Sequence, residues 1–366
     1  MPSGCPVSAK VRRHTVTVHC NMLATDLLAL LQNALPTLGE ALGFPATETL
    51  EIGFLAQGEY NINFLLHGQT QCYVLRYNTG SQIGKSSNAQ LEYEAMALQR
   101  VGESGVCPRF ITLLTEPVPL LVMEYLPGEP LNYRNPEHIT AAAHTLAKLH
   151  QIGLEPGDTF IRRVPCIDDV REAQSWLAPY FSCERAPAPL RRRLKEILQS
   201  ATLSAEYDAA LFPPTAHLAH TDVQAHNFIV HESEESGANA TILSCRLVDW
   251  ERPLRDDLTY DLAHFLIPTT TQWKCDYTFS REEKEAFLNA YLTARPELYP
   301  GEIRHRLHVR QRYIALRAIS WCAGAWVEYT QGNRAITHTQ TLSKIEEYLQ
   351  LDALDQLFDI EKPINI

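Results

Sequence analysis

The chain of 366 residues contains no C-x-x-C pair, although it has nine cysteines. Their odd number and scattered positions are typical of free thiols in a reducing compartment rather than of a disulfide framework. An uninterrupted apolar run of about 18 residues is also missing, and the first 20 residues hold no apolar core of signal-peptide length. We therefore expect a cytoplasmic protein without a membrane span.

Basic residues are in the minority, because 32 Lys and Arg stand against 43 Asp and Glu, a net charge of −11. Nucleic-acid binding needs a basic face, so we expect no nucleic-acid partner. The acidity favours a cationic or neutral small-molecule substrate, and general solubility explains it equally well. The sequence gives no indication of an oligomeric state.

Repeats and low-complexity tracts are absent, but two kinds of hydrophobic pattern divide the chain. A helix is expected near 25–42 and another at 88–104. Strand-like runs lie at about 50–56, 61–67 and 71–77, followed by "RFITLLTE" and "PLLVMEYL". Beyond "PGEP" the chain is mostly helical, with two strand-like pieces, "NFIVHE" and "TILSCRLVDWE". The pattern predicts an α+β protein: a five-stranded sheet with one main helix, a connector, and a larger helical lobe with a β-hairpin.

The stretch "HLAHTDVQAHN" at 217–227 carries the strongest chemical signal. It contains His220-x-Asp222-x-x-x-x-Asn227 directly before a strand, and Asp249 follows at the end of the next strand. Phosphoryl transfer from ATP needs a carboxylate to orient the attacking hydroxyl and oxygen ligands for Mg²⁺. An Asp and an Asn five residues apart, with an Asp on a neighbouring strand, can divide these tasks.

The order of these elements resembles the aminoglycoside phosphotransferase/choline kinase family, relatives of the protein kinases. The resemblance covers about 50–265: "NINFLLHGQTQCYVLRYN", "LEYEAMALQRV", "LLVMEYLPGEPL", "AAAHTLAKLH", "HTDVQAHNFIV" and "RLVDWERPLRDDLTYDLAHFL" occur in the family's order. It implies a protein-kinase-like bilobal fold. The nucleotide-binding lobe would be 1–122, the hinge 123–130, and the helical lobe with the substrate site 131–366.

The resemblance also implies site residues. Asp222 would be the catalytic base, and Asn227 and Asp249 would bind Mg²⁺. The nucleotide ATP would be held by a second set of residues: Arg76, its partner Glu94, the turn at Gly58, and the hinge backbone of Glu124, Tyr125 and Leu126. His220 and Asp261 would support the loop.

Rival interpretations exist for several of these residues. Two alternatives to the kinase loop are a metal site formed by His217, His220, Asp222 and His226, and a purely structural loop. Glu92 competes with Glu94 as the partner of Arg76. "TGSQIGKSS" at 79–87 resembles a phosphate-binding loop, but it is one residue short of the G-x-x-x-x-G-K-S spacing, and we interpret it as a connector.

Candidate contacts to the acceptor are weaker. Asp256 and Asp257 form either a solvated acidic turn or an attraction for a cationic substrate, and Glu251 is a further candidate. Trp326 lies with Trp321 and Tyr329 on helical faces, where aromatics are usually core; the alternative is an aromatic wall for an ammonium group.

We therefore expect an ATP- and Mg²⁺-dependent kinase whose acceptor is the hydroxyl of an amino alcohol, sugar, amino sugar or antibiotic. A protein kinase is disfavoured because only eleven residues separate Asp249 from Asp261. The alternatives are a catalytically silent module that binds nucleotide or a partner, which the arginine at position 76 and the single-glycine turn keep open, and a zinc hydrolase.

Overall fold

The structure, a computed structural model, describes residues 18–234, 241–332 and 339–358. The described residues of Met1–Glu103 and Cys107–Leu126 form a first compact unit, and those of Ser104–Val106, Pro127–Asn333 and Gln340–Ile366 form a second. The chain passes from one to the other between Leu126 and Pro127, inside the segment 123–130 that the sequence analysis assigns to a hinge.

The first unit contains the expected antiparallel five-stranded sheet. Its strands lie in the order β1-β2-β3-β5-β4, and every neighbouring pair is antiparallel. The bounds are β1 (Glu51–Gln57), β2 (Asn61–His67), β3 (Cys72–Asn78), β4 (Phe110–Leu114) and β5 (Leu120–Glu124). Asn63 of β2 pairs with Arg76 of β3, which fixes the side of the sheet on which this arginine lies.

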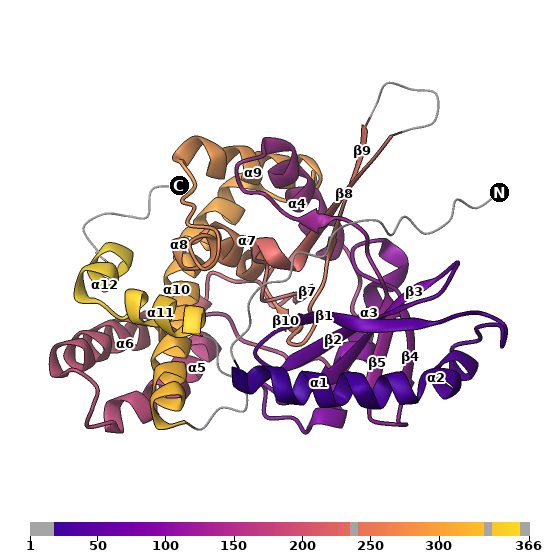
Figure 1. Cartoon of the computed structure of the whole chain (residues 1–366). Coiled ribbons are helices and arrows are strands. Elements are labelled where there is room, and N and C mark those ends of the chain that lie inside the picture. Colours follow the sequence, from indigo (N-terminus) through magenta and orange to yellow (C-terminus); the bar gives the residue numbers. More distant parts are fainter. Residues whose placement is uncertain (1–17, 235–240, 333–338, 359–366) are drawn as a thin grey trace. The chain divides into compact units, whose positions relative to one another are not determined.

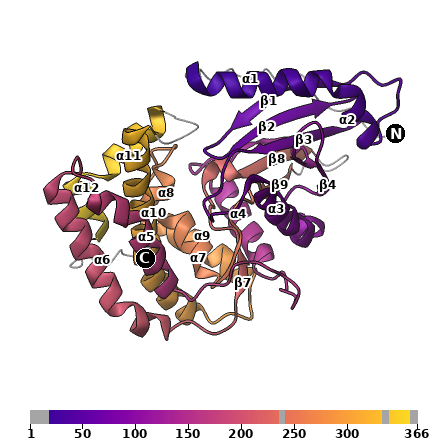
Figure 2. The same ribbon diagram turned by 90° about the horizontal axis from the view of Figure 1, so that it is seen from below.

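Helices lie on both sides of this sheet (Figure 2). They are α1 (Val18–Asn33), α2 (Leu35–Ala41) and α3 (Ser87–Val101), followed by the 3₁₀ turn η1 (Gly102–Ser104). Leu27 and Leu31 of α1 join Phe64 and Leu75 of the sheet in one apolar cluster. Such burial provides most of the stability of a short amphipathic helix.

The single helix expected near 25–42 is wrong in detail, because the structure has two helices there. The break falls at Ala34, whose backbone leaves the helical region (φ −93°, ψ 5°). Pro36 follows within the first turn of α2. A proline has no N–H to donate and is tolerated only in a first helical turn, so it starts a new helix at this point.

The second unit is mainly helical (Figure 1). Its helices are α4 (Pro136–Leu149), α5 (Ile167–Ser182), α6 (Ala188–Ala209), α7 (Thr259–Leu266), α8 (Pro268–Thr271), α9 (Arg281–Thr293), α10 (Pro300–Gln331), α11 (Thr339–Tyr348) and α12 (Leu351–Phe358). Two starts are capped by side chains: Asn135 accepts from the backbone N–H of Glu137, and Ser280 forms a capping box with Glu283.

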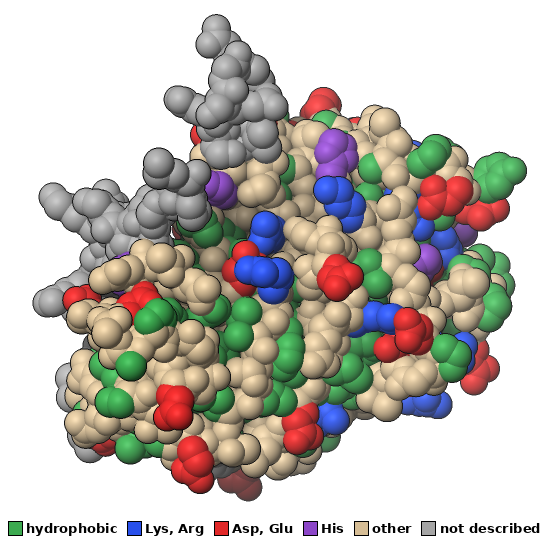
Figure 3. Space-filling view, turned by 90° about the vertical axis from the view of Figure 1, so that its right-hand side faces the viewer, with side chains coloured by type: hydrophobic (Ala, Val, Ile, Leu, Met, Phe, Trp, Pro, Cys, Tyr) green, Lys and Arg blue, Asp and Glu red, His purple; other side chains and the backbone are tan. Residues whose placement is uncertain are grey.

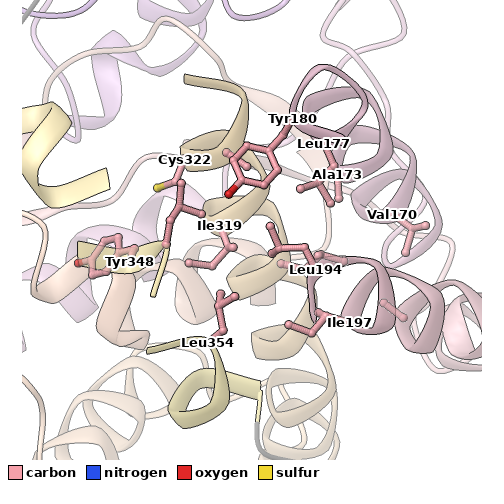
Figure 4. Packing of buried hydrophobic residues seen from close by; sticks show 14 of the residues in the cluster. Val170, Ala173, Leu177, Tyr180, Leu194, Ile197, Ile319, Cys322, Tyr348 and Leu354 are labelled. Carbon is pink, nitrogen blue, oxygen red and sulfur yellow. The ribbon is translucent and has the colours of Figure 1, made fainter. Parts of the chain in front are cut away.

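A large apolar core joins α5, α6 and α10 with the C-terminal helices. Figure 4 shows Leu177 and Tyr180 of α5 beside Ile319 of α10, with Leu194 of α6 and Leu354 of α12 facing the same core. The long helix α10 therefore forms one wall of this core along part of its length. Its remaining faces pack against α7 and α5, where the polar contacts described below occur.

The expected hairpin is β8 (Phe228–Glu234) with β9 (Thr241–Leu247). Three short strands were not predicted: β6 (Glu129–Pro130), which pairs with β8, and β7 (His217–Ala219), which pairs with β10 (Leu254–Asp256). Strands of two or three residues are too short to show an alternating pattern. β7 nevertheless matters, because it ends directly before His220.

Charges of both signs are interspersed on the face shown in Figure 3, and no broad basic area occurs among the described residues of that face. This agrees with the negative net charge. Within the described ranges, every helix is too short or too polar to cross a membrane.

Gly128 provides a test of the close packing between β6 and β8. Its φ is +140°, and a Cβ at this position would lie 2.4 Å from the carbonyl oxygen of Val230. We expect Gly128→Ala to lower the free energy of unfolding by about 2 kcal/mol or more. Gly301→Ala is the control, because Gly301 lies in α10 with open space around it. Urea denaturation followed by circular dichroism measures both; equal midpoints for the two variants would contradict the packing.

Candidate active site

The loop 220–227 is held by one buried carboxylate. Asp261 of α7 is fully buried, and it accepts hydrogen bonds from the backbone N–H groups of His220 and Thr221, each at 2.8 Å. The ring Nε2 of His150 lies 3.1 Å from the same carboxylate. Burial opposes ionisation of Asp261, but the hydrogen bond and charge of His150 outweigh it and keep its pKa below the ordinary value. A charged Asp261 thus anchors the start of the loop.

Thr221 is forced into an unusual backbone conformation. Its φ is +71°, a region that β-branched residues rarely adopt. The contact to Asp261 and a hydrogen bond of 2.7 Å from its Oγ1 to the carbonyl oxygen of Arg252 hold it there. Strain of this kind persists only where the surroundings over-determine it, and it is concentrated at functional sites.

The carboxylate of Asp222 lies at the exposed side of the loop. Its side chain is 36% exposed. The Nε2 of Gln224 donates to both carboxylate oxygens at 3.2 and 3.0 Å, and the Nδ2 of Asn227 donates to Oδ2 at 2.8 Å. These neutral donors fix the orientation of the carboxylate without neutralising its charge.

His264 of α7 is an ionisable neighbour of Asp222, with its Nε2 3.8 Å from Oδ1. The surrounding protein opposes ionisation of Asp222, but His264, His220 and the Gln224 hydrogen bond outweigh it and lower the pKa of Asp222. Burial lowers the pKa of His264 to about 4. At neutral pH the pair therefore consists of a charged carboxylate and a neutral imidazole.

Asn227 and Asp249 lie on neighbouring elements that share backbone contacts. The Nδ2 of Asn227 points to Asp222, and its Oδ1 accepts no hydrogen bond from any residue that the structure describes. The N–H of Val248 donates to the carbonyl oxygen of Asn227 at 2.8 Å, which brings Asp249 next to the loop. Asp249 is half-buried with φ +68°. Amide and carboxylate oxygens of this kind suit Mg²⁺.

The histidines of the loop have structural partners. His220 accepts from the N–H of Asp222 at its Nδ1, and its Nε2 lies 3.0 Å from the carbonyl oxygen of Val248. The Nδ1 of His217 lies 2.8 Å from the carbonyl oxygen of His150, and His226 is exposed. These histidines form no group that could hold a metal ion within the described ranges. The rival histidine metal site has no geometric support.

Arg76 and Glu94 form a buried ion pair in the first unit, with Nη1 2.7 Å from Oε1. The Nε of Arg76 donates to Asn63 at 3.0 Å. The pairing with Glu94 rather than Glu92 is the one expected from the sequence. A guanidinium held on two sides has a fixed position, which suits it to bind an anion.

The other nucleotide candidates lie at a turn and at the end of the sheet. The N–H of Gly58 donates to the carbonyl oxygen of Asn61 at 2.9 Å, and the space around its Cα is open. β5 ends at Glu124, the N–H of Tyr125 lies 3.4 Å from the carbonyl oxygen of Cys72, and Leu126 is half-buried.

The segment 79–87 is a connector, as the sequence analysis favoured. Ser86 caps α3 by accepting from the N–H of Ala89. The Nζ of Lys85 lies 4.8 Å from the centre of the Tyr93 ring, a cation–π contact within the first unit.

Asp256 and Asp257 are buried, so the expected solvated turn is wrong. The Oδ2 atom of Asp256 lies 2.8 Å from Nη2 of Arg310, and the Oδ2 atom of Asp257 lies 2.5 Å from Nη1 of Arg306. Carboxylates already paired with buried guanidinium groups are poor ligands for an ammonium, and the structure does not support their role in substrate binding.

Trp326 is half-buried and makes an edge contact with Tyr180 at 5.6 Å, packed against the apolar core of α5, α6 and α10. This is the core position that aromatics usually occupy at such spacing. Glu251 is half-buried beside the metal segment and stays a candidate.

Sequence reasoning missed several residues around the loop: Gln224, His264, Glu172, Arg252 and Arg317. His264 lies one helical turn after Asp261, so the α7 pattern contained a signal for it. The sequence offers no such signal for Glu172 or Arg317, because they lie on helices far from the loop in the chain.

The arrangement is that of a protein-kinase-like phosphotransferase, and comparisons with known proteins agree. The profile of the phosphotransferase enzyme family matches residues 51–338, most of the chain. The chain therefore belongs to this family and is a small-molecule phosphotransferase. A comparison with curated protein sequences gave no match.

Several solved structures share the fold. An ethanolamine kinase of Plasmodium vivax matches with a TM-score of 0.66 at 16% identity, covering 91% of this chain and 90% of that one. A choline/ethanolamine kinase family protein of Mesorhizobium loti matches with 0.59 at 17% identity, covering 92% and 97%. An ADP-bound aminoglycoside phosphotransferase matches with 0.54 at 17% identity, covering 89% and 98%. At these identities the likeness shows the fold.

Replacement of Asp261 tests the anchoring of the loop. In Asp261→Asn the amide oxygen can still accept from one of the two backbone N–H groups of His220 and Thr221. The amide NH₂ group then faces the other N–H, so that a donor meets a donor. We expect the free energy of unfolding to fall by about 2–4 kcal/mol. Glu346→Gln, on the exposed face of α11, is the control. A stability equal to that of the control, measured by thermal and urea denaturation, would show that the carboxylate does not anchor the loop.

Proposed function

We propose that the protein is an ATP- and Mg²⁺-dependent kinase that transfers the γ-phosphate to a hydroxyl of a small molecule. The observation that supports this most strongly is the exposed, ionised carboxylate of Asp222, fixed by Gln224 and Asn227 on a strained loop. The family and the kinases that share the fold support the same reaction type.

Asp222 acts in this proposal as the base. Its carboxylate orients the acceptor hydroxyl for attack on the γ-phosphorus and accepts the hydroxyl proton as the new O–P bond forms, while the bond from the γ-phosphorus to the β-phosphate oxygen breaks and ADP leaves. A neutral His264 at 3.8 Å does not compete as a cation for this carboxylate at neutral pH. Most of the rate enhancement would come from positioning and electrostatic stabilisation.

Asn227 and Asp249 are the proposed Mg²⁺ ligands. Asn227 offers an Oδ1 to which no described residue donates, and Asp249 offers a carboxylate. Bound Mg²⁺ would neutralise phosphate charge. In the first unit, Arg76 held by Glu94 is proposed to bind the nucleotide phosphates, and the backbone of Glu124 to Leu126 the adenine.

Asp222→Ala tests the catalytic role. Wild type and variant are incubated with Mg·ATP and pooled hydroxyl metabolites, and mass spectrometry detects compounds that gain one phosphate. We expect the variant to lose product formation by a factor of about 100 or more while keeping its affinity for Mg·ATP. Glu346→Gln serves again as the control. Wild-type binding of Mg·ATP without any product would favour the silent nucleotide-binding module instead, and no nucleotide binding would contradict the kinase.

The pH dependence of kcat/KM tests the charge state of Asp222. Activity needs the deprotonated carboxylate, whose pKa is lowered from 3.8, so protonation of Asp222 removes activity only as the pH falls below that ordinary value. His264, with a pKa of about 4, stays neutral at higher pH. We expect no acid limb from either group between about pH 5.5 and 8. An acid limb near pH 6–7 that disappears in His264→Asn would show a titrating histidine and contradict this assignment.

A further inference from the structure

A cluster of charged side chains lies behind the loop in the second unit. Its carboxylates are Asp169, Glu172 and Asp256, and its guanidinium groups are Arg163, Arg252, Arg310 and Arg317. Four positive groups thus face three negative ones. Burial raises the pKa of Asp256 to about 6, which weakens its negative charge near neutral pH. The cluster carries an excess of positive charge.

Glu172 of α5 receives three of these arginines. Arg252 donates to both carboxylate oxygens at 2.7 and 2.6 Å, Arg163 forms a close ion pair, and the Nε of Arg317 lies 3.3 Å away. One carboxylate cannot neutralise three guanidinium groups. Arg163 and Arg252 make further contacts inside the protein, to Asp169 and to the hydroxyl of Tyr260.

Arg317 of α10 differs from the other members. Within the described ranges, Glu172 is the only hydrogen-bond partner of its guanidinium group, and the contact uses Nε alone. The side chain is 12% exposed, yet neither terminal nitrogen is among the fully buried atoms. Nη1 and Nη2, with four N–H bonds between them, therefore reach solvent from a largely buried position. A partly desolvated cation with open donors gains strongly from an anionic acceptor.

The location of this group connects it to the reaction. Helix α10 packs against α7, which carries His264 beside Asp222. The backbone carbonyl oxygen of Arg252, another member of the cluster, accepts a hydrogen bond from the hydroxyl of Thr221, the residue before Asp222. The positive charge of Arg317 contributes to lowering the pKa of both Asp222 and His264. Among the described residues the ion pair of Arg317 is with Glu172 and not with Asp222, so the base does not occupy its terminal nitrogens.

We propose that Arg317 recognises the acceptor and that the acceptor is an anion, a small molecule that carries a carboxylate or phosphate group in addition to the hydroxyl. This inference rests on the proposed kinase function. Two of the residues expected to receive a cation, Asp256 and Asp257, do not oppose it, because they are already paired with Arg310 and Arg306. The planar guanidinium presents two parallel N–H donors, which match the two oxygens of a carboxylate or phosphate.

The test uses matched acceptors with Mg·ATP and a coupled measurement of ADP release. The carboxylate arm compares glycerate with glycerol, the phosphate arm compares ribose 5-phosphate with ribose, and the cationic arm uses choline and ethanolamine. The variants are Arg317→Gln, which removes the charge, and Arg317→Lys, which keeps the charge and loses the fork. Arg304→Gln is the control, because Arg304 lies on the same helix and pairs with Glu285.

We expect wild type to phosphorylate glycerate in preference to glycerol, or ribose 5-phosphate in preference to ribose. Arg317→Gln should raise the KM for the acid by about 10- to 100-fold, with little change in kcat or in the KM for ATP, and Arg317→Lys should recover part of the loss. Melting temperatures show whether each variant folds. Preference for choline or ethanolamine, or a KM that does not respond to Arg317→Gln, would overturn the proposal.

Calorimetry of glycerate and inorganic phosphate binding to the full chain with Mg·ADP gives a readout without turnover. Binding to wild type that Arg317→Gln weakens supports the proposal even where none of these acceptors is phosphorylated. The proposal is overturned if wild type binds neither anion, or if Arg317→Gln binds both anions as tightly as wild type does. Failure of the kinase function is a separate result, seen as absent Mg·ATP binding or as turnover that Asp222→Ala leaves unchanged.

Discussion

The candidate active site depends on the buried carboxylate of Asp261. It gathers two backbone N–H groups of the loop and the ring of His150, so three segments far apart in the chain meet at one charge. A buried anion of this kind is stable only while all its donors are present, which makes the arrangement all-or-none. The left-handed backbone of Thr221 is held by the same contacts, and the position of Asp222 follows from it.

The second constraint is the short backbone link between the loop 220–227 and the segment that contains Asp249. Val248 donates to the carbonyl oxygen of Asn227 and accepts at its own carbonyl oxygen from His220. Val248 uses only main-chain atoms in both hydrogen bonds, so these bonds do not depend on the side chain at position 248. The separation of Asn227 and Asp249 is therefore set by the fold, and the side chains only provide the oxygen ligands.

Much of the fold and site could be predicted because the signals are local. The sheet, α3 and the pair Arg76–Glu94 follow from runs of several residues in a fixed order. Asp256 and Asp257 show the limit of such reasoning. Two adjacent acidic residues beside a turn look solvated, and only Arg306 and Arg310, about 50 residues further on, bury and neutralise them. Pairing across such a distance depends on how α10 packs, which no local pattern contains.

Because of this packing, the charge balance near the site differs from the net charge of the whole chain. The chain as a whole is acidic, with a net charge of −11, and that value is compatible with a cationic or neutral acceptor and equally with general solubility. In the second unit, however, four guanidinium groups pair with the carboxylates of Asp169, Glu172 and Asp256, and Arg317 contacts Glu172 through Nε alone. Interactions at a few ångströms outweigh the screened charge of a distant surface. In the proposed kinase, the charge preferred in the acceptor would therefore depend on side chains of α10 and α5 rather than on the net charge of the chain.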